Sequence, residues 1–358
     1  MKEFLRRNWI ILGIELLVVL AFCIFYGKFG DSVVDSFREF YIPSRVVDGR
    51  ILYKNIFTIY APFAYLFNAL LFVVFGVKLK VVQIAGLFTT MGIFYLTYKI
   101  SLKFLNKLYS TSILLFMFSG LVLSSNVFNA FFPYSYGILY GLLFVLCSIY
   151  FALEKKYPIA YFFCSLAICS KYEFILFIIP LIFLSKKEAW NKNILAFITP
   201  FLITYLPLFF MGLGFKDIFT TISIISVMTS TKTLAWFYST TGLTFRFEHI
   251  PLYIINILKF YIPVYWKLWQ EVIIWIFPAI FILGCIRFKK INLEEKFFIL
   301  SSILISAKVF FALTLQSYGI YFIPFGLISF FILLPEKMKK YSCAALIIWS
   351  LIAGYNNG

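Results

Sequence analysis

The chain consists largely of apolar runs that are long enough to cross a lipid bilayer. Of its 358 residues, 63% are hydrophobic and 13% are charged, whereas an average soluble protein has about half and about a quarter. A membrane-embedded backbone must satisfy its own hydrogen bonds, as a helix bundle or as a closed barrel. Because the runs are continuous rather than alternating, the sequence predicts an all-α, polytopic membrane helix bundle that forms a single domain over residues 1–358.

Eleven segments are predicted to span the membrane. They lie at about 9–27, 81–99, 111–131, 137–153, 157–170, 173–184, 194–213, 271–286, 297–314, 321–334 and 341–354. A further apolar stretch, 62–76, is short for a crossing, which needs roughly 20 residues. If it spans, the lysine-rich loop 99–107 falls outside; if it is a juxtamembrane or re-entrant helix, that loop is cytoplasmic. We adopt the second topology because it satisfies the positive-inside rule.

The basic residues gather in short loops that this topology places in the cytoplasm. The net charge of +17 is therefore attributed to membrane orientation and anionic headgroups, and no nucleic-acid partner is expected. The N-terminal KEFLRR and the run after it indicate an uncleaved signal anchor with a cytoplasmic N-terminus. The six cysteines lie in apolar runs without a CxxC pair, and His249 is the only histidine. Neither a disulfide nor a thiolate metal site is expected.

Two long outer loops follow from this topology, at 28–80 and 214–270. The first contains a dense polar segment from Asp31 to Pro62, which follows the first span directly. It holds four of the fifteen acids and four basic residues: Asp31, Asp35, Glu39, Asp48, Arg38, Arg45, Arg50 and Lys54. We expect a membrane protein with so few acids to place its chemistry where it groups them.

An ordered series of short motifs runs along the first outer loop. It reads Asp35-Ser36-Phe37-Arg38-Glu39, then Asp48-Gly49-Arg50-Ile51-Leu52-Tyr53-Lys54, then Tyr60-Ala61-Pro62, then Phe75-Gly76. In order and spacing the series resembles the first outer loop of the GT-C glycosyltransferases, which include the protein O-mannosyltransferases and the bacterial aminoarabinose transferases, and the chain is similar to glycosyltransferase family 39. Members of this superfamily are polytopic enzymes that take a sugar from a polyprenyl-phosphate carrier on the outer face of the membrane.

Two later motifs extend the resemblance. Phe132-Pro133-Tyr134-Ser135-Tyr136 lies at the outer end of a predicted span, where many members of the family carry an Asp-Pro pair. Lys171-Tyr172-Glu173 resembles the family's K-x-P/E turn. Because no Asp occurs near Pro133, a second acid would come from Glu173 or Asp31.

The chemistry of glycosyl transfer assigns roles to these residues. A carboxylate suits the base that takes the proton of an acceptor hydroxyl, and a guanidinium fork suits the departing phosphate. Asp35 and Arg38 lie on one face of a helical turn. The candidate catalytic residues are therefore Asp35, as the general base, and Glu39, which would orient Arg38 or the acceptor. The candidate substrate-binding residues are Arg38, Lys54, Tyr60, Tyr134, Lys171 and Glu173.

The sequence thus predicts a membrane glycosyltransferase that moves a sugar from a polyprenyl-phosphate donor to a glycan, lipid or protein acceptor on the non-cytoplasmic face. The Phe-, Ile- and Lys-rich composition favours a bacterial plasma membrane, and a divalent metal cofactor is left open. The alternatives are a transporter or flippase of lipid-linked glycans, an O-antigen ligase-like enzyme, and a non-catalytic membrane subunit. A transporter typically carries charges or broken helices near the membrane midplane, whereas here they gather in one outer loop.

Overall fold

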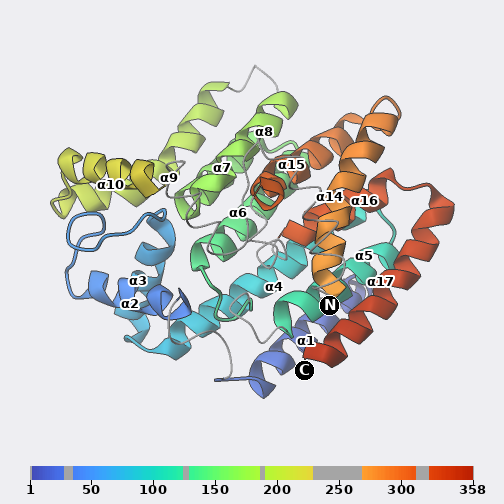
Figure 1. The fold of residues 1–358 in the computed structure, drawn as a ribbon, viewed down its shortest axis with the longest axis horizontal. Helices are drawn as coiled ribbons and strands as arrows, with labels where there is room; N and C mark the ends of the chain where they lie inside the picture. Colours follow the sequence, from blue (N-terminus) through green and yellow to red (C-terminus); the bar gives the residue numbers. More distant parts are fainter. Residues whose placement is uncertain are drawn as a thin grey trace.

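The computed structural model describes residues 2–27, 35–123, 129–185, 190–228, 268–311 and 322–357. Within these ranges the chain forms fourteen α-helices, one π-helical segment and one 3-10 segment, and it forms no β-strand (Figure 1). The prediction of an all-α fold is therefore confirmed for the described part of the chain.

Each of the eleven segments predicted to span the membrane contains helical structure, although the helical structure described for the predicted segment 111–131 ends at Val122. The helices that cover these segments are α1 (Lys2–Ile24), α4 (Leu79–Phe104), α5 (Lys107–Met117) with the π-helical segment Phe118–Val122, α6 (Tyr136–Leu153), α7 (Tyr157–Ser170), the 3-10 segment Tyr172–Phe177 with α8 (Ile178–Leu184), α9 (Trp190–Phe210), α14 (Leu268–Arg287), α15 (Leu293–Phe311), α16 (Ile323–Leu333) and α17 (Glu336–Asn357). The remaining helices fall in the predicted outer loops: α2 (Asp35–Val47), α3 (Phe63–Phe75) and α10 (Phe215–Met228).

Three of the described helices, α4, α6 and α9, are long and apolar enough to cross a membrane. Several other apolar helices are shorter, including α7 with 14 residues. These helices indicate contact with a lipid bilayer. The count of eleven spans, the cytoplasmic N-terminus and the type of membrane stay predictions.

Helix α3 is the apolar stretch whose topology the sequence left open. Its 13 residues reach only about 20 Å, against a hydrocarbon core about 30 Å thick. It ends at Phe75, and the capping residue Gly76 has a φ of 84° and donates its N–H to Phe72 O. Glycine takes this left-handed conformation without the strain that a side chain would add. This length favours the juxtamembrane or re-entrant alternative.

Helix α6 lies at the centre of the bundle and packs against α4 and α7 (Figure 1). Two glycines allow neighbouring backbone segments to approach each other closely around α6. A Cβ on Gly137 would lie 2.6 Å from Ser170 O at the end of α7, and one on Gly86 of α4 would lie 2.3 Å from Phe131 O. The packing therefore holds the segment before α6 against α4, and holds the start of α6 against the end of α7.

A second, smaller apolar core joins the first outer loop to the end of α9. It consists of Ile42, Ile51, Leu52, Tyr65, Leu208 and Leu213. Figure 1 shows α2, α3 and α10 grouped at one end of the molecule, away from α14, α15, α16 and α17. This core fixes the loop between α2 and α3 relative to the bundle.

Candidate functional site

Helix α2 carries the acidic motif of the first outer loop and presents two different faces. Ser36 and Glu39 are fully buried, whereas Tyr41 and Arg45 on another face remain accessible. Asp35 is the first residue of α2, but its side chain lies outside the described part of the chain, as does Asp31. The assignment of Asp35 as the base stays a prediction.

Glu39 is held from three sides. Its Oε1 accepts hydrogen bonds from Arg38 Nε at 3.3 Å and from the Tyr65 hydroxyl at 3.3 Å. Its Oε2 accepts the backbone N–H of Tyr136 at 2.8 Å. Both oxygens are engaged in a buried position, a geometry that suits a residue orienting Arg38 better than one contacting an acceptor. The structure thus favours one of its two expected roles, that of a positioning residue.

Arg38 lies between two tyrosines from distant parts of the sequence. Its Nη1 donates to the Tyr60 hydroxyl at 3.4 Å and its Nη2 donates to Tyr134 O at 3.0 Å. The guanidinium carbon is 4.5 Å from the centre of the Tyr60 ring and 5.2 Å from that of Tyr134. Since 22% of the Arg38 side chain is exposed, this oriented cation remains accessible to a ligand.

A second cation, Lys171, approaches the same tyrosine. Its Nζ lies 5.6 Å from the centre of the Tyr60 ring and 3.8 Å from Glu173 Oε1. Lys171 follows α7 directly and is buried. The structure therefore brings together six of the eight predicted site residues. We call this set the Arg38 cluster; it consists of Arg38, Glu39, Tyr60, Tyr134, Lys171 and Glu173.

Burial and charge determine the protonation states in the Arg38 cluster. Burial raises the pKa of Glu39, although Arg38, the N–H of Tyr136 and Lys171 act in the opposite direction. Burial also raises the pKa of Tyr60, against the influence of Arg38. Burial disfavours the charged form of Arg38, but Glu39 and the neighbouring tyrosines together outweigh it and raise the pKa of Arg38. At neutral pH Tyr60 is therefore a neutral hydroxyl that positions other groups and does not act as a base.

Sequence reasoning missed a chain of tyrosine hydroxyls behind Tyr60. The Tyr53 hydroxyl donates to Tyr60 O at 2.7 Å and lies 3.3 Å from the Tyr172 hydroxyl, which is 3.0 Å from that of Tyr205. Tyr53 has a φ of 68°, a conformation uncommon for residues other than glycine. The motifs included Tyr53 and Tyr172, but spacing along the chain carries no signal that their hydroxyls meet.

The side chain of Lys54 contacts the turn after α9, and its role in holding a phosphate stays a prediction. Its Nζ donates to Gly212 O at 2.8 Å, in the turn between α9 and α10. Among the described residues it forms no contact with the Arg38 cluster. Lys54 therefore ties the first outer loop to the end of α9.

A metal site was left open by the sequence. Within the described ranges, no group of three or more His, Cys, Asp or Glu side chains could hold a metal ion. Within the Arg38 cluster, the cationic side chains that could face a phosphate are those of Arg38 and Lys171.

Comparison with protein-family models, with curated proteins and with solved structures finds no match to this chain. The function is accordingly argued from the chemistry of the site.

Proposed function

We propose that the chain is a membrane glycosyltransferase that transfers a sugar from a polyprenyl-phosphate donor to a glycan, lipid or protein acceptor. One observation carries the proposal. Arg38 and Lys171, more than a hundred positions apart in the sequence, both lie against the ring of Tyr60, and Arg38 is oriented by the buried carboxylate of Glu39. Two neighbouring cations can bind a phosphate. Because helices long enough to cross a membrane lie in the same molecule, a phosphate that is attached to a lipid fits this arrangement.

The proposed reaction places developing negative charge at these cations. The acceptor oxygen bonds to the anomeric carbon, the bond from that carbon to the phosphate oxygen breaks, and the polyprenyl phosphate leaves. Arg38 and Lys171 stabilise the charge that forms on the leaving phosphate, and a preorganised pair does so without reorganising in the transition state. The proton of the acceptor hydroxyl passes to Asp35. Inversion at the anomeric carbon is what the resemblance to the GT-C glycosyltransferases implies.

Tyr60 and Tyr134 have a supporting role in this proposal. Their hydroxyls lie 3.2 Å apart, and their rings flank the guanidinium of Arg38. A guanidinium that is stacked on aromatic rings and bonded at both terminal nitrogens has few orientations to lose when a ligand binds. Lysine in place of Arg38 would keep the charge but not this planar arrangement.

The test compares cell-envelope glycans by mass spectrometry after deletion of the gene and complementation. Wild type is expected to restore a sugar modification that Asp35→Asn and Arg38→Gln do not restore. Two variants of exposed residues outside the Arg38 cluster, Glu294→Gln and Lys78→Gln, should restore it fully. An unchanged glycan profile after deletion, or full restoration by Asp35→Asn at equal protein level, would refute the proposal.

A further inference from the structure

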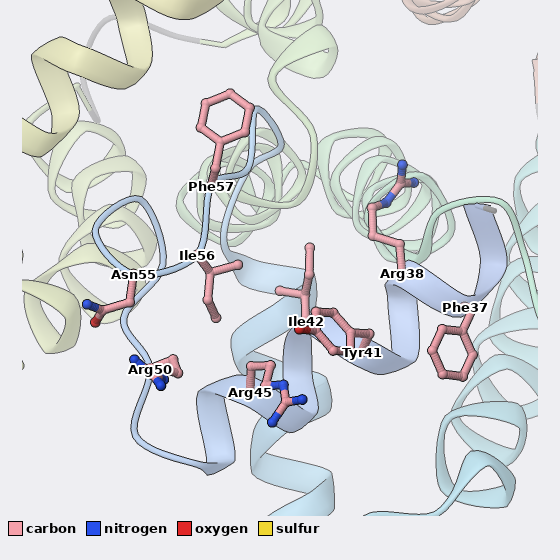
Figure 2. Close-up of a pocket in the computed structure, with 9 residues that line it drawn as sticks. All are labelled: Phe37, Arg38, Tyr41, Ile42, Arg45, Arg50, Asn55, Ile56 and Phe57. Carbon is pink, nitrogen blue, oxygen red and sulfur yellow. The ribbon is translucent and has the colours of Figure 1, made fainter.

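An open groove lies between α2 and the loop that follows it. Its volume is about 880 Å³. One wall is formed by Arg38, Tyr41, Ile42 and Arg45, whose spacing places all four on a single face of the helix. The loop 50–57 forms the other wall. Figure 2 shows Arg45 on the helix and Arg50 on the loop, and Arg38 extending away from both of them.

The groove is rich in positive charge that the protein only partly neutralises. Arg45 Nη1 pairs with Asp48 Oδ2 at 3.1 Å, and both side chains are about half exposed, at 47% and 55%. The guanidinium of Arg45 also lies 4.9 Å from the centre of the Tyr41 ring. Arg50 is exposed and forms no side-chain hydrogen bond or ion pair within the described part of the chain. Two accessible guanidinium groups therefore face a space with one carboxylate beside it.

Apolar and aromatic side chains continue the groove on both walls. Phe37 and Tyr41 on α2 and Phe57 on the loop are largely exposed, at 47%, 45% and 55%. Figure 2 shows Ile56 above Arg45 and Arg50 in this view, and Ile42 beside Tyr41. Arginines beside exposed aromatic residues on an amphipathic helix are typical of a surface that binds anionic amphiphiles at the membrane interface. The arginine fork matches the oxygens of a phosphate.

We propose that this groove binds the phosphate of a membrane amphiphile through Arg45 and Arg50, with the hydrocarbon chain against Phe37, Tyr41 and Phe57. The groove adjoins the Arg38 cluster, because Arg38 lines part of its wall, but neither Arg45 nor Arg50 belongs to that cluster. Arg45 follows Arg38 by two helical turns, which is about 10 Å along the axis. The inference concerns binding alone, so it does not depend on the proposed transfer reaction.

The experiment measures binding of dodecyl phosphate to the purified full-length chain by isothermal titration calorimetry. The protein is kept in dodecyl maltoside micelles, which supply an uncharged amphiphile with the same hydrocarbon chain. The variant Arg45→Gln/Arg50→Gln is expected to weaken binding about tenfold or more, since charge-assisted hydrogen bonds to phosphate are lost. The matched control Lys78→Gln/Lys80→Gln removes the same charge just after α3 and should bind like wild type.

A second variant is expected to bind dodecyl phosphate more tightly, and misfolding would not produce such an increase in affinity. Asp48→Asn frees Arg45 from its ion pair and should tighten dodecyl phosphate binding severalfold. The proposal is overturned if Arg45→Gln/Arg50→Gln binds as tightly as wild type, or if Asp48→Asn leaves the affinity unchanged. It is also overturned if inorganic phosphate binds as tightly as dodecyl phosphate, because the groove would then be a site for a free anion and not for a lipid headgroup.

Discussion

The contact between Gly86 of α4 and the segment before α6 is expected to hold the Arg38 cluster in place, and Gly86→Ala tests this. A Cβ at this position would lie 2.3 Å from Phe131 O and 2.9 Å from Phe131 C. Both are backbone atoms, which cannot rotate away as the end of a side chain could. The carbonyl of Phe131 accepts the Tyr136 hydroxyl at 2.9 Å, and the N–H of Tyr136 binds Glu39. A shift of Phe131 therefore reaches the residue that orients Arg38.

The expected change in the free energy of unfolding combines two destabilising contributions and one stabilising contribution. Carbon and oxygen atoms at 2.3 Å lie about 1 Å inside normal contact, and overpacking of this kind costs about 1–3 kcal/mol. Weakening the hydrogen bond from Tyr136 costs about 1 kcal/mol. Replacing glycine by alanine within a helix returns about 1 kcal/mol. The net expectation for Gly86→Ala is a loss of about 1–3 kcal/mol in the free energy of unfolding.

The assay is thermal unfolding of the purified protein in detergent, with Gly13→Ala as the control. Gly13 lies within α1, and a Cβ there would meet no atom within 4 Å. Gly13→Ala should therefore melt at or slightly above the wild-type temperature, whereas Gly86→Ala should melt several degrees lower. If both variants melt alike, Gly86 has room for a side chain, and the proposed link from α4 to Glu39 is refuted.

Three further predictions concern charge and topology. Burial raises the pKa of Glu39, so its contribution to stability is fully present below about pH 4.3, the unfolded pKa, and is lost as the pH rises through the folded pKa. Wild type should therefore melt at a higher temperature than Glu39→Gln at low pH, and this difference should shrink as the pH rises. A melting-temperature difference that stays constant with pH would contradict the proposed pKa shift of Glu39. Lys54→Met should lower the free energy of unfolding by about 1 kcal/mol, because a hydrogen bond to Gly212 O is lost, and it should leave the donor KM unchanged. A large rise in KM would support the phosphate role of Lys54. With the exposed native cysteines replaced by serine, an impermeant maleimide should label Asp48→Cys from outside and not Leu108→Cys, and reversed labelling would invert the topology.

The positions of the helices could be predicted from the sequence because apolar runs and their charged boundaries are local features. The short segment 62–76 is an example: its length left its topology open, the positive-inside rule separated it from the predicted spans, and it forms the 13-residue helix α3. The run 173–184 is divided between a 3-10 segment and α8. Periodicity does not distinguish these two helix types over so few residues.

The members of the Arg38 cluster could be selected by motif, but their individual contacts could not. Glu39 was expected to orient Arg38 or the acceptor, and its burial among Tyr65 and Tyr136 depends on the packing of α3 and α6. Lys54 stands in the same motif series, yet its side chain reaches Gly212. The direction of a long side chain in a loop is decided by tertiary contacts, which spacing along the chain does not encode.

The most direct test of the central claim is acceptor-dependent release of polyprenyl phosphate by the purified protein. Polyprenyl-phosphate-linked sugars are supplied one at a time with cell-envelope acceptors, and the freed lipid phosphate is quantified by mass spectrometry. Wild type is predicted to release it with at least one donor, while Asp35→Asn and Arg38→Gln lose about a hundredfold or more in rate. A flippase would move the donor without consuming it. No release by wild type with any donor, or an undiminished rate in both variants, would contradict the account.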